Sequence, residues 1–118
     1  MAGCGHVHDE RLTADYRLIA VDVLEDMSVN RSLTDGTAIG RIDPIVFAVG
    51  WNDRYIVAKQ HPANDRYVTN YYYLEIARDS RFAEPNQSVT GPLTEAAFME
   101  RKAELRLPDF SRTIKQLE

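Results

Sequence analysis

Two apolar runs joined by a short polar segment constrain the fold of this chain more than any other feature. Residues 45–50 (IVFAVG) and 55–60 (YIVAKQ) are rich in β-branched and aromatic side chains, which favour β-strands. Asn and Asp tolerate positive φ, so Asn52-Asp53 can form the two-residue loop of a β-hairpin between the two runs. Both faces of that hairpin are largely apolar, and we therefore expect it to lie inside a sheet that is covered on both sides.

The predicted register of the hairpin pairs Val49 with Ile56 and Phe47 with Ala58. Further segments with the composition of strands lie before and after it: residues 15–23 (DYRLIAVDV), 27–33, 37–42 and 67–77 (YVTNYYYLEIA). No helical pattern separates these segments, which argues against a parallel sheet built from βαβ units.

One helix is predicted near the C-terminus, after a segment at 79–92 that is mostly loop. Thr94 is a good N-cap residue and Glu95 suits the first turn. Pro108 limits the helix at its other end, so we expect it to run from 94 to about 106. The tail, residues 109–118, spaces its apolar residues like a short docking helix: Phe110, Ile114 and Leu117.

Strands first and a helix last predict an α+β fold. We expect an antiparallel β meander with a central hairpin at about 45–60, one C-terminal helix at about 94–106 packed on the sheet, and a short docking tail. A chain of 118 residues has the length of one domain. Residues 1–12 lack a periodic apolar pattern and are expected to form a flexible N-terminal tether, with 13–118 as a single α+β domain.

The net negative charge of the chain comes from its N-terminal end. The chain has 14 Lys and Arg against 18 Asp and Glu, a formal net charge of -4. Residues 1–26 hold six acidic and two basic side chains, whereas the remainder is balanced. This charge argues against a general nucleic-acid binder, which needs a basic face. The acidic stretch is either a solvated edge or a contact for a basic partner.

Cys4 is the single cysteine, so an intramolecular disulfide is excluded. It follows Ala2-Gly3, and two small residues precede the lipidated cysteine in the signal of bacterial lipoproteins. We therefore expect lipid attachment at Cys4 and a place in the bacterial cell envelope, with the domain facing the periplasm or the outside of the cell. The alternative is an incidental cysteine in a cytoplasmic protein.

Cys4, His6 and His8 alternate along the chain and would share one face of an extended segment. Thiolate and imidazole are ligands for a soft divalent ion. The segment is rich in glycine and terminal, so its ligands are not preorganised. We therefore expect solvated polar residues here and no metal or other cofactor.

Two further candidates lie in the body of the chain. His61 follows the hairpin, with aspartates nearby in sequence, and could act as a general base or simply as a polar cap on the hairpin. Tyr67, Tyr71 and Tyr73 alternate on one face of the predicted strand at 67–77. Tyrosine combines a large contact area with a polar tip, so this face is a candidate surface for a protein partner, with ordinary sheet packing as the alternative.

Three strings of the sequence resemble a known family. They are VFAVGWNDRYIVAKQHP (46–62), TNYYYLEIAR (69–78), and GPLTEAAF (91–98) followed by LRLPD (105–109). The chain is similar in these strings to small bacterial proteins of the domain-of-unknown-function family 3997. The resemblance implies a short secreted protein, often a lipoprotein, with such a hairpin and a C-terminal helix. It implies no activity and no site residues.

The sequence thus predicts an uncharacterised bacterial envelope protein that acts as a non-enzymatic protein-binding module, tethered through Cys4. An immunity or inhibitor protein is one concrete version. The expected partner is another protein, not a nucleic acid, and contact with a membrane is expected only through the lipid anchor. The alternative is a small cytosolic enzyme or enzyme subunit that uses His61.

Overall fold

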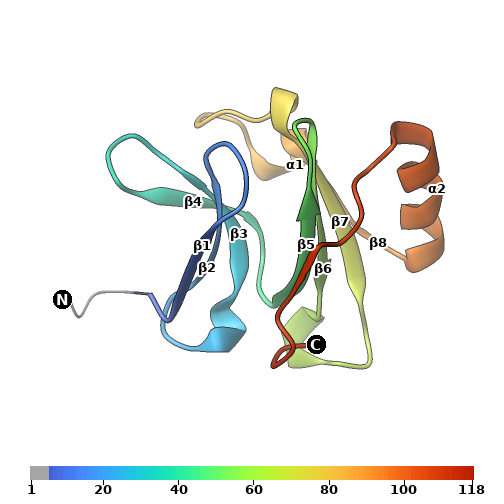
Figure 1. Cartoon of the computed structure of the whole chain (residues 1–118), viewed down its shortest axis with the longest axis horizontal. Helices are drawn as coiled ribbons and strands as arrows, with labels where there is room; N and C mark the ends of the chain where they lie inside the picture. The colour runs from blue at the N-terminus through green and yellow to red at the C-terminus, as the bar shows by residue number, and fades with distance from the viewer. Residues whose placement is uncertain (1–5) are drawn as a thin grey trace.

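The computed structural model describes residues 6–118 as two antiparallel sheets with one main helix on the outside (Figure 1). The first sheet has the order β1-β2-β3-β4 and the second the order β8-β7-β6-β5-β9. The strands are β1 (His8–Arg11), β2 (Tyr16–Ala20), β3 (Ser28–Ser32), β4 (Ala38–Ile42), β5 (Val46–Trp51), β6 (Tyr55–Gln60), β7 (Asn70–Glu75), β8 (Val89–Leu93) and β9 (Arg112–Thr113). The α+β class and the antiparallel pairing predicted from the sequence are confirmed.

The helices are short except for one. They are the 3-10 turns η1 (Leu24–Asp26), η2 (Pro62–Asn64) and η3 (Ile76–Arg78), the single turn α1 (Pro85–Ser88), and α2 (Glu95–Leu105). None of the helices in the described part of the chain is long and apolar enough to cross a membrane. Helix α2 covers the outer face of the second sheet, on the side away from the first sheet (Figure 1).

The central hairpin is confirmed as β5 and β6, but its predicted register is wrong by two residues. Val49 lies opposite Ala58, and Trp51 lies opposite Ile56. The side chain of Asn52 explains the shift, because its Oδ1 accepts hydrogen bonds from the two backbone N–H groups at positions 54 and 55, at 2.9 and 2.8 Å. Asn52 therefore opens the turn instead of lying in its loop. A shift of two residues keeps the alternation of β6, so Ile56 and Ala58 remain on one face and Val57 on the other.

Both faces of the hairpin are buried, as the sequence predicts. Ile56 and Ala58 face a large apolar core that lies between the two sheets and includes Leu18 of β2. Val57 faces a second, smaller core beneath α2, where it packs with Phe98. The second sheet thus forms the middle layer of the molecule.

The predicted helix at 94–106 is confirmed as α2. The Oγ1 of Thr94 accepts a hydrogen bond from the N–H of Ala97 at 3.2 Å, which caps the N-terminus. The helix ends where Arg106 adopts the left-handed conformation, with φ of 57°. Phe98 is the buried residue of this helix, so it covers the sheet with one large side chain.

The tail at residues 109–118 docks on the body of the protein, as the sequence predicts, but it does not form the expected short helix. This tail instead contributes β9, which pairs with β5 at the edge of the second sheet (red in Figure 1). Gly50 permits this arrangement, because a Cβ at this position would lie 1.9 Å from the carbonyl oxygen of Asp109. Ile114 and Leu117 then reach the core between the sheets.

The N-terminal segment is more ordered than the sequence predicts. Residues 8–11 form β1 and pair with β2, although residues 1–12 were expected to be flexible. The strand is hard to detect because its sequence, HDER, contains no apolar residue. The carboxylate of Glu10 accepts a hydrogen bond from Nε of Arg112 at 3.0 Å, which joins β1 to β9 across the two sheets. Residues 1–5 lie outside the described part of the chain.

One strand lies in the segment 79–92 that was expected to be mostly loop. Strand β8 pairs with β7 and forms an edge of the second sheet. Its sequence, VTGPL, contains a glycine and a proline, which are both poor strand formers. Proline, which has no backbone N–H, is tolerated here because one side of an edge strand forms no hydrogen bonds with a neighbouring strand.

The close contact at Gly50 gives a test of the tail. Gly50→Ala should lower the free energy of unfolding by about 3 kcal/mol, because the backbone at 109–110 would have to move away from β5. Gly40→Ala in β4 is the matched control, since its nearest neighbour would be 3.9 Å away, and its effect should stay within about 0.5 kcal/mol. Equal effects of the two substitutions in urea unfolding would contradict the packing described here.

Candidate binding site

A buried ion pair joins the first sheet to the segment that follows β7. Nε of Arg41, in β4, lies 2.9 Å from one carboxylate oxygen of Asp79, and the side-chain exposures are 3% and 0%. Removing both charges from water is costly, and additional hydrogen bonds to the two side chains offset part of that cost. The other partners of both side chains therefore decide how far the pair is stabilised.

Tyr16 and Arg31 complete the surroundings of Asp79. The hydroxyl of Tyr16 donates to Oδ2 of Asp79 at 2.6 Å, and Nη1 of Arg31 lies 3.5 Å from the same oxygen. Burial alone would raise the pKa of Asp79, but the hydrogen bonds from Tyr16 and Arg41 and the charges of the two arginines outweigh it, so this pKa is lowered. The carboxylate is therefore held in its charged form.

The pKa of Tyr16 is shifted in the opposite direction. Burial raises it first, and the hydrogen bond to Asp79 and the negative charge of that carboxylate raise it further, against the smaller effect of Arg31. Tyr16 thus stays a neutral hydroxyl that donates its proton to the carboxylate.

Arg41 also fixes the β7–β8 connection, by which we mean residues 76–88. Its Nη2 donates to the carbonyl oxygens of Ser80 and Ala83, at 2.9 and 3.1 Å, and its Nη1 donates to that of Gly40 at 3.3 Å. One guanidinium therefore ties β4 to three points of a loop that contains only single turns of helix. Figure 1 shows this connection (yellow to orange) reaching from the second sheet towards the first.

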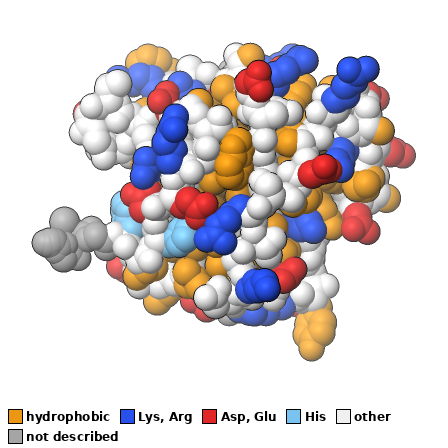
Figure 2. Space-filling view, viewed as in Figure 1, with side chains coloured by type: hydrophobic (Ala, Val, Ile, Leu, Met, Phe, Trp, Pro, Cys, Tyr) orange, Lys and Arg blue, Asp and Glu red, His pale blue; other side chains and the backbone are white. Residues whose placement is uncertain are grey.

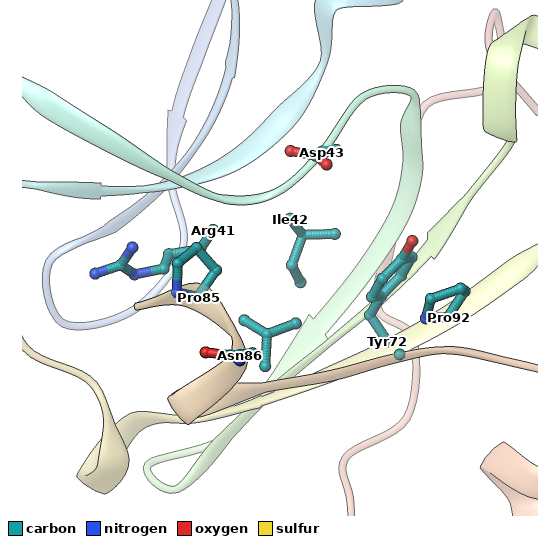
Figure 3. Close-up of a pocket in the computed structure, with 9 residues that line it drawn as sticks. Arg41, Ile42, Asp43, Tyr72, Pro85, Asn86 and Pro92 are labelled. Atoms are coloured by element: carbon teal, nitrogen blue, oxygen red, sulfur yellow. The ribbon is translucent and has the colours of Figure 1, made fainter. Parts of the chain in front are cut away.

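A cleft of about 250 Å³ lies on one side of the connection, and we call it the proline cleft (Figure 3). It is lined by Arg41, Ile42, Asp43, Tyr72, Pro85, Asn86, Val89, Gly91 and Pro92. Figure 3 shows Tyr72 and Pro92 next to each other on one wall, with Pro85 and Asn86 on the opposite wall. Gly91 allows the close approach of the wall, because a Cβ there would lie 2.4 Å from the ring of Tyr72.

A second cleft of about 350 Å³ is lined by other residues of the connection. It is lined by Asp15, Arg31, Ser32, Leu33, Thr34, Ser80, Arg81 and Phe82. Phe82 is 85% exposed at its rim. The guanidinium carbon of Arg81 lies 5.2 Å from the centre of the Phe82 ring. The connection thus exposes a large aromatic side chain to solvent, while the hydrogen bonds from Arg41 hold its backbone in place.

The three tyrosines expected to form a partner surface do not lie on one exposed face. Tyr67 is fully exposed, but it precedes β7, because a hydrogen bond from its N–H to Oδ1 of Asp65 forms a turn there. Tyr71 is buried under α2, with its ring centre 5.1 Å from that of Phe98. Tyr73 is half-buried beside the same core. Sheet packing, the alternative weighed above, describes Tyr71 and Tyr73.

The hydroxyl of Tyr71 donates to Oε2 of Glu95 at 3.1 Å. Burial raises the pKa of this hydroxyl, and the hydrogen bond to the carboxylate and its negative charge raise it further. The bond links β7 to the first turn of α2, so the tyrosine has a structural contact of its own.

His61 follows the hairpin and is buried. The residue is 3% exposed, its ring stacks on Phe47 with centres 4.1 Å apart, and its Nδ1 lies 2.9 Å from the carbonyl oxygen of Val68. It lines neither the proline cleft nor the second cleft. The described contacts of His61 are therefore those of a packed core residue.

The three candidate metal ligands do not form a metal site in the described part of the chain. Cys4 lies outside that part of the chain, and a bend at Val7 separates the other two. His6 lies 3.7 Å from Asp9, whereas His8 lies 3.0 Å from Glu10. Figure 2 shows histidine next to acidic and basic side chains on this face. Residues 6–118 contain no group of three His, Cys, Asp or Glu side chains that could hold a metal ion.

Sequence reasoning missed the residues that organise the site. Arg41 and Asp79 are 38 positions apart, and each looks like an ordinary surface charge in its own segment. Phe82 lies in the segment that the sequence predicts to be mostly loop. An isolated aromatic residue in a polar loop is the one signal that could have found this surface.

One family of known proteins matches most of the chain. The family model of a protein of unknown function (DUF3997) matches residues 13–115, and the chain belongs to that family. The resemblance noted from the sequence is therefore confirmed. No curated protein and no solved structure matches the chain.

The lowered pKa of Asp79 gives a test of the buried pair. Asp79→Asn should reduce the free energy of unfolding by about 3 kcal/mol at pH 7, because it leaves the buried Arg41 without its counter-charge. The folded-state pKa lies below the usual value of 3.8, so the contribution of the carboxylate is present above that value and is lost as the pH falls through the folded-state pKa. The difference between the two proteins should therefore shrink in acid.

Asp15→Asn is the matched control for this experiment. Its carboxylate is 67% exposed and lies 3.9 Å from Arg31, so its removal should change the free energy of unfolding by no more than about 0.5 kcal/mol. A loss at Asp79 that is as small as this, or one that does not change with pH, would contradict the assignment.

Proposed function

We propose that this protein is a non-enzymatic protein-binding module that contacts its partner through the surface around Phe82. The observation that carries the proposal is the 85% exposure of Phe82 on a connection held by the buried pair of Arg41 and Asp79. Aromatic side chains supply much of the binding energy at protein interfaces. A loop that is already fixed loses little conformational freedom on binding, which strengthens association.

The surroundings of Phe82 support the same proposal. Arg81 stacks near its ring, and the adjoining cleft holds Arg31 and Asp15 together with hydroxyl side chains. An apolar anchor beside a polar, charged rim is typical of interfaces that form and dissociate. An immunity or inhibitor protein, which blocks an enzyme of the envelope, is the concrete version that suits a small domain with a preformed contact surface.

We further propose that the domain is held in the bacterial cell envelope by a lipid on Cys4. The support is the Ala2-Gly3-Cys4 triplet and the family, whose resemblance implied secreted proteins. Strand β1 begins at His8, only a short distance along the chain from Cys4. The membrane would therefore lie close to the first sheet, and partner binding at the β7–β8 connection would take place near the membrane surface.

A photo-crosslinking experiment tests the binding surface. p-Benzoylphenylalanine is placed at position 82 or at position 67 in cells that make the protein from its own gene. Both native side chains are exposed aromatics, so they differ in location and not in accessibility. We expect one discrete crosslinked product at position 82, because the partner covers that side chain, and none at position 67.

The crosslinking experiment can also contradict the proposal. A discrete product only at position 67, or the same products at both positions, would contradict the proposal. Phe82→Ala should leave the free energy of unfolding within about 0.5 kcal/mol of the wild type, since the side chain is exposed. The same substitution should remove competition by unlabelled protein for the crosslinked product.

The proposed anchor is tested by labelling with an alkyne analogue of palmitate. Protein made from its full natural gene should carry the label and sediment with membranes, and Cys4→Ser should abolish both. Cys4 is the single cysteine of the 118 residues, so Cys4→Ser removes the one thiol of this sequence. Label that persists in the Cys4→Ser variant, or its absence from the wild type, would contradict the anchor.

A further inference from the structure

The carboxylate of Asp43 stands at the proline cleft without a partner in the described part of the chain. The residue is exposed, and none of the ion pairs among residues 6–118 includes it. Its backbone is fixed, because Nε2 of Gln60 donates to the carbonyl oxygens of Asp43 and Pro44 at 2.9 and 3.2 Å. The backbone that carries this exposed carboxylate is therefore held in place.

The nearest cation of the cleft cannot neutralise this carboxylate. Arg41 also lines the cleft, but its guanidinium is occupied by Asp79 and by the carbonyl oxygens of the β7–β8 connection. Figure 3 shows that this guanidinium points away from Ile42 and Tyr72. The remaining lining residues carry no formal charge, so the cleft has an uncompensated negative charge at one end.

The rest of the cleft is suited to an aliphatic chain and a flat cation. Ile42, Val89 and the two prolines give apolar walls, and the Tyr72 ring gives an aromatic one. The hydroxyl of Tyr72 is held by its hydrogen bond to Oε1 of Gln60 at 3.1 Å. Asp43 and Tyr72 line the same cleft. Burial, and then the charge of Asp43, raise the pKa of this hydroxyl.

We propose that the proline cleft binds an arginine side chain of the partner protein. The aliphatic stem would lie between the prolines and Val89, and the guanidinium would pair with Asp43 while facing the Tyr72 ring. At about 250 Å³ the cleft is below the ~300–1,000 Å³ usual for drug-sized ligands, which suits a single long side chain. This inference rests on the proposed function in one respect, namely that the arginine belongs to a protein.

The chemistry favours arginine over the other long side chains. A guanidinium is planar, can bind a carboxylate through two hydrogen bonds, and stacks on aromatic rings. A lysine ammonium is more strongly hydrated and does not match this geometry. An apolar side chain would fill the walls and leave the carboxylate of Asp43 without a partner.

Amide NMR titration of the full chain with Nα-acetyl-arginine amide tests the proposal without any partner protein. We expect saturable shifts at the backbone amides of Asp43, Tyr72, Val89 and Gly91, with millimolar affinity. Nα-acetyl-lysine amide should bind more weakly, and the uncharged Nα-acetyl-norleucine amide more weakly still. Asp43→Asn should weaken binding of the arginine amide by about tenfold, the scale of one strong hydrogen bond to a charged group.

Asp53→Asn is the matched control, since this aspartate is exposed in the turn of the central hairpin, and it should leave the affinity unchanged. Equal binding of arginine and norleucine amides to the wild type would overturn the proposal without relying on a variant. Equal binding of the lysine amide, or equal losses at Asp43 and Asp53, would overturn it as well. The crosslinking at position 82 does not depend on any of these results, so a failure here is distinct from a failure of the proposed function.

Discussion

The buried pair of Arg41 and Asp79 is the interaction on which the proposed binding surface depends. The two sheets meet through an apolar core, and apolar contacts alone specify position weakly because they have no direction. The guanidinium of Arg41 adds direction, since it binds one carboxylate and carbonyl oxygens on both β4 and the β7–β8 connection. Tyr16 brings β2 into the same network. A charge that is costly to bury thus fixes where the connection lies relative to the first sheet.

Both clefts follow from this arrangement. The connection forms a wall of the proline cleft through Pro85 and Asn86 and the rim of the second cleft through Arg81 and Phe82. An exposed aromatic side chain and an unpaired carboxylate therefore flank the same fixed segment. A partner that inserts an arginine near Asp43 and covers Phe82 would contact both sides of it. Fixing the segment before binding lowers the entropic cost of recognition.

The sequence predicts the parts of this fold that depend on local patterns. The apolar runs identify β5 and β6, and Thr94 identifies the start of α2, because strand composition and helix capping act over a few residues. Strand β1 and the strand in the tail, β9, were missed for the opposite reason. The pairing of β1 and the contact of Gly50 with the tail join residues that are distant in sequence. The register failed at Asn52, where one side chain decides the turn. The candidate site could not be predicted, because Arg41 and Asp79 share no sequence pattern. The packing of the helix on the sheet was expected, but no local signal shows that it covers Tyr71.

Hydrogen exchange in Arg41→Lys tests the central claim most directly. Lysine keeps the positive charge beside Asp79 but lacks the planar set of donors that binds several carbonyl oxygens at once. The account predicts that the backbone amides of Ala83 and Gln87, in the connection, exchange at least about tenfold faster, while the amides of β5 and β6 keep their wild-type rates. Unchanged exchange at Ala83 and Gln87, or a uniform increase throughout the molecule, would contradict a guanidinium that holds this segment in place.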